Sequence, residues 1–212
     1  MNIALIGASG FIGSAIRSEA LARGHQVTAL VGRPEQLAAH PKLTALAADV
    51  MDVGRLTAQL AGLDAVISAF SGHAQGDVLA YYVAGIGNVI TAAKEARVPR
   101  LLVVGGAGSL EVAPGVLLID SPSFPPQYKA TAEGARQALE MLRKEAVLDW
   151  TMLSPSAMIA PGQRTGVFRT GRDQLLTAAD GSSAISVEDY AVAMIDELEK
   201  PAHARQRFTV GY

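Results

Sequence analysis

Cysteine is absent from this chain of 212 residues, which excludes disulfides, thiolate nucleophiles and cysteine-ligated metal. Its four histidines and its acids show no spacing typical of a metal site, so we expect no metal. The net charge of −2 lacks the basic surplus of a nucleic-acid-binding protein. No apolar run approaches the roughly 18 residues of a membrane span, and the N-terminus lacks the basic region of a signal peptide. We therefore expect a cytoplasmic protein with neither nucleic-acid nor membrane partners.

Half of the residues are apolar, and strand-like and helix-like patterns alternate along the chain. After an N-terminal strand, further strands are expected at residues 26–31, 43–47, 64–69, 100–105, 150–154 and 207–211. Because each helix must carry the chain back over the sheet, this alternation predicts an α/β fold with a doubly wound parallel sheet and helices on both faces. Residues 157–186 contain glycines and prolines that predict substrate-side loops within one domain, 1–212.

The stretch NIALIGASGFIG at residues 2–13 is the most informative part of the sequence. An apolar strand meets glycines at Gly7, Gly10 and Gly13, and a helical pattern follows at once. Gly7 permits a tight turn, Gly10 lets phosphates approach the backbone, and Gly13 lets helix and strand pack closely. The N–H groups and positive dipole end of the helix then face the anion. This arrangement predicts a site for the pyrophosphate of a dinucleotide.

The ends of the next strands indicate which dinucleotide fits. Arg33 follows the second strand, where an arginine suits a 2′-phosphate and an acid would suit NAD. The sequence therefore favours NADP, with NAD as the alternative and a solvated loop arginine as the other interpretation. Asp49 and Val50 follow the third strand and are candidates for contact with adenine, unless Asp49 is a turn residue that starts the next helix. The residues that end the fourth strand are expected beside the nicotinamide ribose: Ser68, Ala69 and Phe70.

Candidate catalytic residues follow the fifth strand. Gly106 belongs to a glycine-rich turn, GGAGS, that predicts a close-approach surface beneath a nicotinamide. Ser109 ends this turn and is either a hydrogen-bond donor to the substrate or a turn serine. Tyr128, beside Lys129 at the start of a helix, is a candidate proton donor, although adjacent helical residues point about 100° apart. His73, in a loop at the same edge, is either pocket lining or a surface residue.

Six stretches carry a resemblance to a known family: GASGFIGSAI at 7–16, RGHQVTALVGRP at 23–34, RLLVVGGAGSLEVAPG at 100–115, LDWTMLSPSAMIAPGQRTG at 148–166, GSSAISVEDYAVAMIDELE at 181–199 and RFTVGY at 207–212. They resemble the atypical branch of the short-chain dehydrogenase/reductase superfamily, which has a Rossmann-type fold. More narrowly, they are similar to the NmrA-like group of NAD(P)H-flavin reductases. The resemblance covers nearly the whole chain in order.

This resemblance implies further site residues. The glycine motif of the family falls on Gly7, Gly10 and Gly13, and its phosphate-contacting residues fall on Ser9, Phe11 and Ile12. Its ribose-phosphate arginine is displaced by one position, from Gly32 to Arg33. Catalytic members of the wider superfamily use a Tyr-x-x-x-Lys pair, whose places here fall at about Ala132 and Arg136. Tyr128 lies one turn earlier and is at best a substitute for that tyrosine.

Three functions remain open at this point. The first is an NAD(P)H-dependent reductase whose small-molecule acceptor is FMN, another flavin, a quinone or a similar planar ring, since such a ring can take its proton from solvent. The second is a non-catalytic redox sensor that binds NADP(H) and reports to a partner protein. The third is an epimerase or isomerase, which would need an acid and a base on opposite faces of its substrate. A monomer or a homodimer is expected.

Overall fold

The strands that the apolar pattern predicts all form, and they follow one another in the predicted order. The computed structural model describes residues 1–72 and 76–212. The main elements are β1 (Asn2–Ile6), α1 (Phe11–Ala22), β2 (Gln26–Val31), β3 (Leu43–Ala47), α2 (Val53–Leu60), β4 (Ala65–Ser68), α3 (Val78–Glu95), β5 (Arg100–Val104), α4 (Lys129–Arg143), β8 (Asp149–Ser154), β10 (Arg169–Gly171), α5 (Val187–Glu199) and β12 (Gln206–Gly211). The shorter elements, where η marks a 3-10 helix, are η1 (Pro34–Gln36), η2 (Ala107–Ser109), β6 (Glu111–Ala113), β7 (Val116–Leu117), η3 (Leu118–Asp120), η4 (Pro126–Tyr128), β9 (Met158–Ala160) and β11 (Ala184–Ser186).

Within the described residues, eight strands form one sheet in the order β10-β12-β8-β5-β4-β1-β2-β3. Neighbouring strands run parallel, except that β10 pairs antiparallel with β12. The chain moves outward from β1 through β2 to β3 and then returns to β4, on the other side of β1. Such a reversal opens a crevice at the carboxyl ends of β1 and β4, where ligands bind in doubly wound sheets. The predicted fold class is confirmed.

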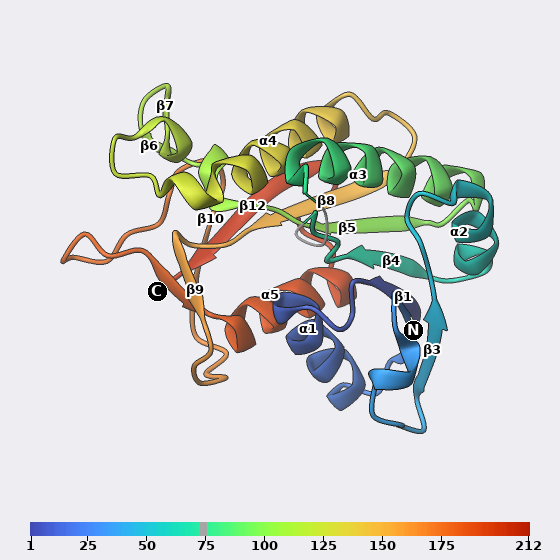
Figure 1. Cartoon of the computed structure of the whole chain (residues 1–212). Coiled ribbons are helices and arrows are strands. Elements are labelled where there is room, and N and C mark those ends of the chain that lie inside the picture. The colour runs from blue at the N-terminus through green and yellow to red at the C-terminus, as the bar shows by residue number, and fades with distance from the viewer. Residues whose placement is uncertain (73–75) are drawn as a thin grey trace.

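Helices cover both faces of the sheet (Figure 1): α1 and α5 lie on one face, and α2, α3 and α4 lie on the other. Side chains along β1 alternate between these layers, so that Ile3 and Leu5 pack under α1 and α5 while Ala4 and Ile6 pack toward α2, α3 and α4. A strand buried on both faces must be apolar at successive positions. Each fully buried Leu or Ile contributes about 1.5–3 kcal/mol to stability.

Local signals in the sequence set most helix ends. Gly24 has a φ of +86°, the left-handed conformation expected of the glycine that follows α1. Ser186 caps α5 as predicted, because its hydroxyl accepts a hydrogen bond from the Asp189 backbone N–H at 3.0 Å. Two further aspartates cap helices in the same way: Asp52 starts α2, which the apolar pattern did not indicate, and Asp77 starts α3.

The segment after Pro155 forms loops with short strands, as predicted. Its first strand, β9, leaves the main sheet and pairs in parallel with β11, while β10 adds an antiparallel edge to β12. Across residues 1–72 and 76–212, no helix combines the length and apolarity needed to cross a membrane.

Candidate functional site

The first glycine turn lies at the carboxyl ends of β1, β2 and β4, where the direction of winding reverses. Gly7 N–H donates to Leu30 O of β2 at 2.9 Å, and Ala69 N–H donates to Ile6 O at 2.9 Å, so three strand ends meet at this turn. Gly7 has a φ of +78°, and a Cβ there would lie 2.5 Å from Ala69 O. A Cβ at Gly13 would lie 2.1 Å from Gly7 O. The tight turn at Gly7 and the close helix–strand packing at Gly13 are therefore as predicted.

Gly10 differs from these two glycines because its missing side chain leaves open space. A Cβ there would meet only Gly7 O, at 3.4 Å, and the neighbouring Ser9 and Phe11 are exposed. The backbone N–H groups of Phe11, Ile12 and Gly13 have no acceptor within residues 1–72 and 76–212. Unpaired N–H groups at the positive end of a helix form a site for an anion. The turn therefore fits the pyrophosphate of a dinucleotide.

The end of β2 is open toward the same crevice. A Cβ at Gly32 would meet nothing within 4 Å, and the side chain of Arg33 is exposed before η1 begins. After β3, the Oδ1 atom of Asp49 accepts from the Met51 N–H at 2.9 Å, which is the turn role considered above. Val50 is buried, and its carbonyl accepts from Asn88 of α3 at 3.1 Å. Contact of these residues with a cofactor stays a prediction.

The residues that end β4 face the interior. Ser68 is buried, and its hydroxyl has no partner among the described residues. The ring of Phe70 stacks on Tyr82 with centroids 5.8 Å apart, and fills the space that a side chain at Gly85 would need. Burial raises the pKa of Tyr82 to about 12, so this phenol stays neutral. Packing on α3 therefore accounts for the Phe70 ring, while Ala69 and the backbone N of Phe70 border the glycine turn.

The glycine-rich turn after β5 packs closely against two neighbouring elements. A Cβ at Gly105 would lie 2.8 Å from Met152 of β8, one at Gly106 would lie 3.0 Å from Ala135, and one at Gly108 would lie 2.8 Å from Ala132. The close approach that these glycines permit is thus with β8 and α4. Contact between the Gly106 backbone and a nicotinamide stays a prediction.

Ser109 points under this turn, toward the face of the sheet. It is buried, and its Oγ accepts from Nη1 of Arg207 at 3.2 Å. Arg207 lies on β12, is itself buried and also donates from Nε to Asp173 at 2.9 Å. Ser109 therefore holds a structural contact, and its role toward a substrate stays a prediction. One sign of this role was present in the sequence, because Arg207 is a charged residue at the start of the apolar strand RFTVG. Its contact with Ser109 was not predicted.

The start of α4 carries no phenol–ammonium pair. The Tyr128 side chain is 57% exposed at the end of η4, directly before α4. Ala132, at the place of the tyrosine of the superfamily, is buried against Gly108. Arg136, at the place of the lysine, donates to Glu133 through Nε at 2.8 Å and Nη2 at 2.7 Å. His73 lies outside the described residues.

Residues 161–166, called the strap below, tie the segment after β9 to α5. Asp189 of α5 is fully buried and accepts from the backbone N–H groups of Thr165 and Gly166, both at 2.8 Å, and from the hydroxyl groups of Thr165 and Tyr212. Burial raises the pKa of Asp189, but these hydrogen bonds outweigh it and hold the pKa below its ordinary value. The sequence indicated Asp189 only as the residue three positions after the cap Ser186. That position does not predict its hydrogen bonds to the strap.

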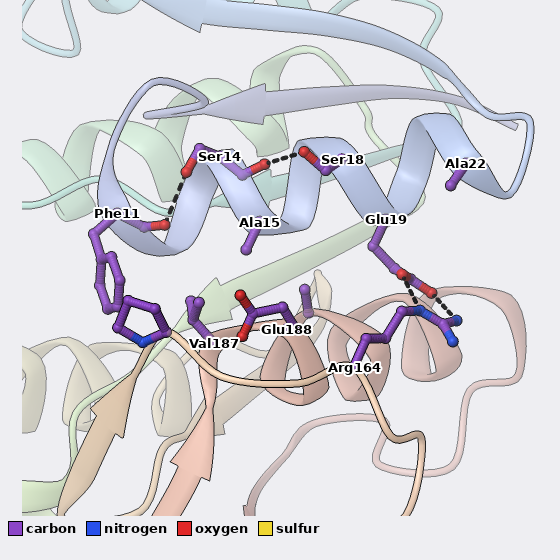
Figure 2. A pocket seen from close by; sticks show the side chains of 11 residues that line it. Phe11, Ser14, Ala15, Ser18, Glu19, Ala22, Arg164, Val187 and Glu188 are labelled. Carbon is purple, nitrogen blue, oxygen red and sulfur yellow. Dashed lines mark hydrogen bonds and ion pairs between the residues drawn. The ribbon is translucent and has the colours of Figure 1, made fainter.

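The strap also reaches α1 (Figure 2). Arg164 donates to both carboxylate oxygens of Glu19 at 2.7 Å, across a cavity of about 480 Å³ bounded by α1, α5 and the strap. The hydrogen bond from Arg164 lowers the pKa of the buried Glu19 against the effect of burial, and Arg23 lowers it further. Phe11 lies at the other end of this cavity, where α1 begins. The strap thus lies along α1, with the Arg164–Glu19 pair at one end of the cavity and Phe11 at the other.

Fold and glycine turn together define a doubly wound α/β protein with a site for a dinucleotide. The profile of the NAD(P)H-binding family matches residues 7–201, and the chain belongs to that family. YwnB of Bacillus subtilis is 44% identical over 214 aligned residues, which cover 99% of this chain and 98% of YwnB. The resemblance to the atypical short-chain dehydrogenase/reductases is confirmed at this level.

Two solved structures are also similar over their whole length. One, from Bacteroides thetaiotaomicron and named "putative epimerase", has a TM-score of 0.94 and 44% identity, covering 100% of this chain and 96% of that one. Another, from Streptococcus pneumoniae and named "putative NADH-flavin reductase", has a TM-score of 0.88 and 34% identity, covering 100% of this chain and 99% of that one.

Proposed function

We propose that this protein is an NAD(P)H-dependent oxidoreductase that reduces a flavin, a quinone or a similar planar acceptor. The observation that carries the proposal is the open turn at Gly10, with three N–H groups at the start of α1 that have no acceptor among the described residues. It supports dinucleotide binding, and the name of the Streptococcus pneumoniae relative supports a flavin as acceptor. A small-molecule partner and a cytoplasmic location belong to the same proposal.

In this proposal the residues of the chain bind and orient rather than react. The N–H groups of Phe11, Ile12 and Gly13 bind the pyrophosphate, and Arg33 favours the 2′-phosphate of NADP. When bound, the reduced nicotinamide supplies a hydride to the acceptor ring. The ring also gains a proton. This proton comes from solvent, because the chain lacks the tyrosine–lysine pair that would donate it, and because Tyr128, the candidate substitute, is exposed. Positioning of the two rings is then the main contribution to rate.

The residues of α4 favour a reductase over an epimerase, which is the activity in the name of the Bacteroides thetaiotaomicron relative. An epimerase needs an acid and a base placed on opposite faces of a substrate carbon. At the two expected places this chain has Ala132, which cannot exchange a proton, and Arg136, which is engaged by Glu133. Neither residue can act as such an acid or base.

A second candidate function is a redox sensor that binds NADP(H) and presents a surface to a partner protein. The observation in its favour is the exposure of the segment around the strap, where Met158 is 66% and Val167 is 76% exposed. Large apolar side chains at the surface are typical of protein contacts when they form a patch.

Steady-state oxidation of NADPH, and separately of NADH, with FMN, riboflavin and a simple quinone tests the proposal. Turnover of about 1 per second or faster, the lower end of ordinary enzyme rates, would support a reductase. Binding of NADPH without turnover on any acceptor would contradict the reductase and favour the sensor. The Gly10→Val variant serves as the control, because background oxidation by free flavin persists in it.

A further inference from the structure

Arg17 lies against the glycine turn, although sequence analysis did not single it out. It belongs to the second turn of α1, and its Nη1 donates to Ala8 O at 3.0 Å. Side chains on a helix tilt toward its N-terminus, so a residue in the second turn can reach back to the loop before the helix. The guanidinium group of Arg17 is therefore held at the turn that fits the pyrophosphate.

Helix geometry places Arg17 on the side of α1 that faces β2. Glu19 points toward the strap and α5, where it meets Arg164 (Figure 2). Residues two apart on a helix point about 160° apart, so Arg17 projects away from α5. The main neighbours of α1 are α5, β1 and β2, so the side turned away from α5 is the side of β2. Arg17 thus lies toward the corner where β2 ends.

The end of β2 brings a second arginine to this corner. Gly7 N–H donates to Leu30 O at 2.9 Å, which ties the glycine turn to β2. Arg33 follows two residues after Val31, the last residue of β2. In doubly wound folds the group that ends β2 contacts the 2′ position of the adenosine ribose. Arg17 approaches this corner from α1, and Arg33 approaches it from β2.

Both guanidinium groups retain donors for a ligand. Of the ion pairs formed within residues 1–72 and 76–212, none includes Arg17 or Arg33. A guanidinium has five N–H donors, and within the described chain Arg17 uses one of its donor atoms, on Ala8 O. Two planar donor groups directed toward one corner would suit a phosphate, because a phosphate accepts several charge-assisted hydrogen bonds.

We infer that Arg17 acts with Arg33 to bind the 2′-phosphate of NADPH, and that Arg17 is a specificity-determining residue for NADP over NAD. This inference rests on the dinucleotide binding in the proposed function. It adds a helix residue to the strand-end arginine that the sequence indicated. It also explains how Arg33 can bind the 2′-phosphate although the arginine of the family falls one position earlier, at Gly32. A second cation, Arg17 on α1, contributes to binding the same phosphate.

Equilibrium binding separates this role from a purely structural one. Dissociation constants of NADPH, NADH, 2′,5′-ADP and 5′-ADP are measured by calorimetry for the wild-type protein and for Arg17→Gln and Arg33→Gln. Glutamine keeps the length and helix propensity of Arg17 while removing its charge. The control is Arg55→Gln, since Arg55 is exposed on α2 and its removal changes the net charge equally.

For Arg17→Gln we expect binding of NADPH and 2′,5′-ADP to weaken about tenfold or more, while NADH and 5′-ADP change by less than about twofold. Arg55→Gln should leave all four constants unchanged. Equal weakening of all four ligands would mean that Arg17 only holds the turn, and an unchanged NADPH constant would mean that it has no role; either result overturns the inference. If the wild-type protein binds none of the four, the proposed function fails as well. Binding without acceptor turnover leaves this inference standing and contradicts only the reductase.

Discussion

A Cβ atom at Gly7 or Gly13 would collide with backbone at 2.5 or 2.1 Å, whereas one at Gly10 would meet only a carbonyl oxygen at 3.4 Å. Folding therefore requires the first and third glycines of the motif. No contact within the protein requires glycine at the second position, Gly10, as strictly. A pyrophosphate bound at this turn, as proposed, would explain why the position has no side chain. Gly10 also has an ordinary φ of −73°, so a larger residue there is not strained.

Gly10→Val and Gly13→Ala should therefore fail in different ways. We expect Gly10→Val to keep a Tm within about 4 °C of the wild type and to bind NADPH at least about 100-fold more weakly, because its side chain occupies the anion site. Gly13→Ala should lower the free energy of unfolding by about 2 kcal/mol or more, because α1 must move away from β1. Thermal unfolding and NADPH titration measure both effects.

The matched control is Gly87→Ala on α3, where a Cβ would meet nothing within 4 Å. It should leave binding unchanged and raise stability slightly, as alanine does at helical glycines. Undiminished NADPH affinity in Gly10→Val would disprove the assignment of the glycine turn.

Tyr128→Phe tests where the acceptor obtains its proton. Because this side chain is 57% exposed, solvent reaches the same place, and we expect turnover to fall by no more than about tenfold with cofactor affinity unchanged. Tyr81→Phe, whose ring packs 5.5 Å from Phe70, is the matched control for loss of a phenol hydroxyl. A decrease of about 100-fold or more in Tyr128→Phe alone would identify it as a general acid.

At the scale of elements, two buried carboxylates, Asp189 and Glu19, hold the strap. Asp189 accepts hydrogen bonds from two strap N–H groups and two hydroxyl groups, while Arg164 carries the strap across to Glu19 on α1. Loss of these acceptors would leave strap donors unpaired beside α5. The strap therefore links α5 to α1.

The acid sensitivity of the protein should reflect Asp189. Because its pKa is lower in the folded protein than in the unfolded chain, its stabilising effect is complete above the ordinary pKa of aspartate and is lost as pH falls through the folded value. Asp189→Asn should cost about 2 kcal/mol of unfolding free energy at neutral pH, and less as the pH falls below about 4. Urea unfolding at a series of pH values measures this difference.

Asp180 offers the comparison, since it is exposed and its pKa is lowered by Ser182 alone among side chains. Asp180→Asn should change stability little at any pH. If the unfolding free energies of Asp189→Asn and the wild type differ by the same amount at every acid pH, the charge of the carboxylate contributes nothing to stability.

At the scale of the whole molecule, the proposed site joins several strand ends. Gly7, Ala69 and Leu30 link β1, β4 and β2 through backbone hydrogen bonds at the crevice. A dinucleotide bound there contacts the folded sheet and not the unfolded chain, so it must raise the apparent stability of the entire fold. The increase depends on concentration and on affinity only.

NADPH at 100 times its dissociation constant should add about 2.7 kcal/mol to the stability of the protein. For a chain of this length that corresponds to a rise in Tm of about 5–10 °C. NADH at the same concentration should raise the Tm less, because it lacks the group that Arg17 and Arg33 are proposed to bind. Thermal unfolding with each nucleotide checks this, and equal shifts would contradict a preference for NADP.

Local sequence patterns determined the strands, the order of elements and the glycine turn. Apolar runs such as NIALI follow from burial on both faces of a sheet, and Gly7 follows from a turn that only glycine can adopt. Ser186 was predictable as a cap because its partner, Asp189, lies three residues away. In each case the pattern that indicates the feature lies within a few residues, so the sequence by itself is sufficient to predict it.

Tertiary structure alone decided the roles that depend on distant partners. The glycines after β5 are small because α4 and β8 pack on them, the Phe70 ring packs on α3, and Ser109 contacts Arg207. Arg17 contacts the turn through a partner only nine residues away, but the fold is needed to bring it to the corner where β2 ends. Partners that are distant along the chain meet only when the sheet is complete, and no local pattern records that meeting.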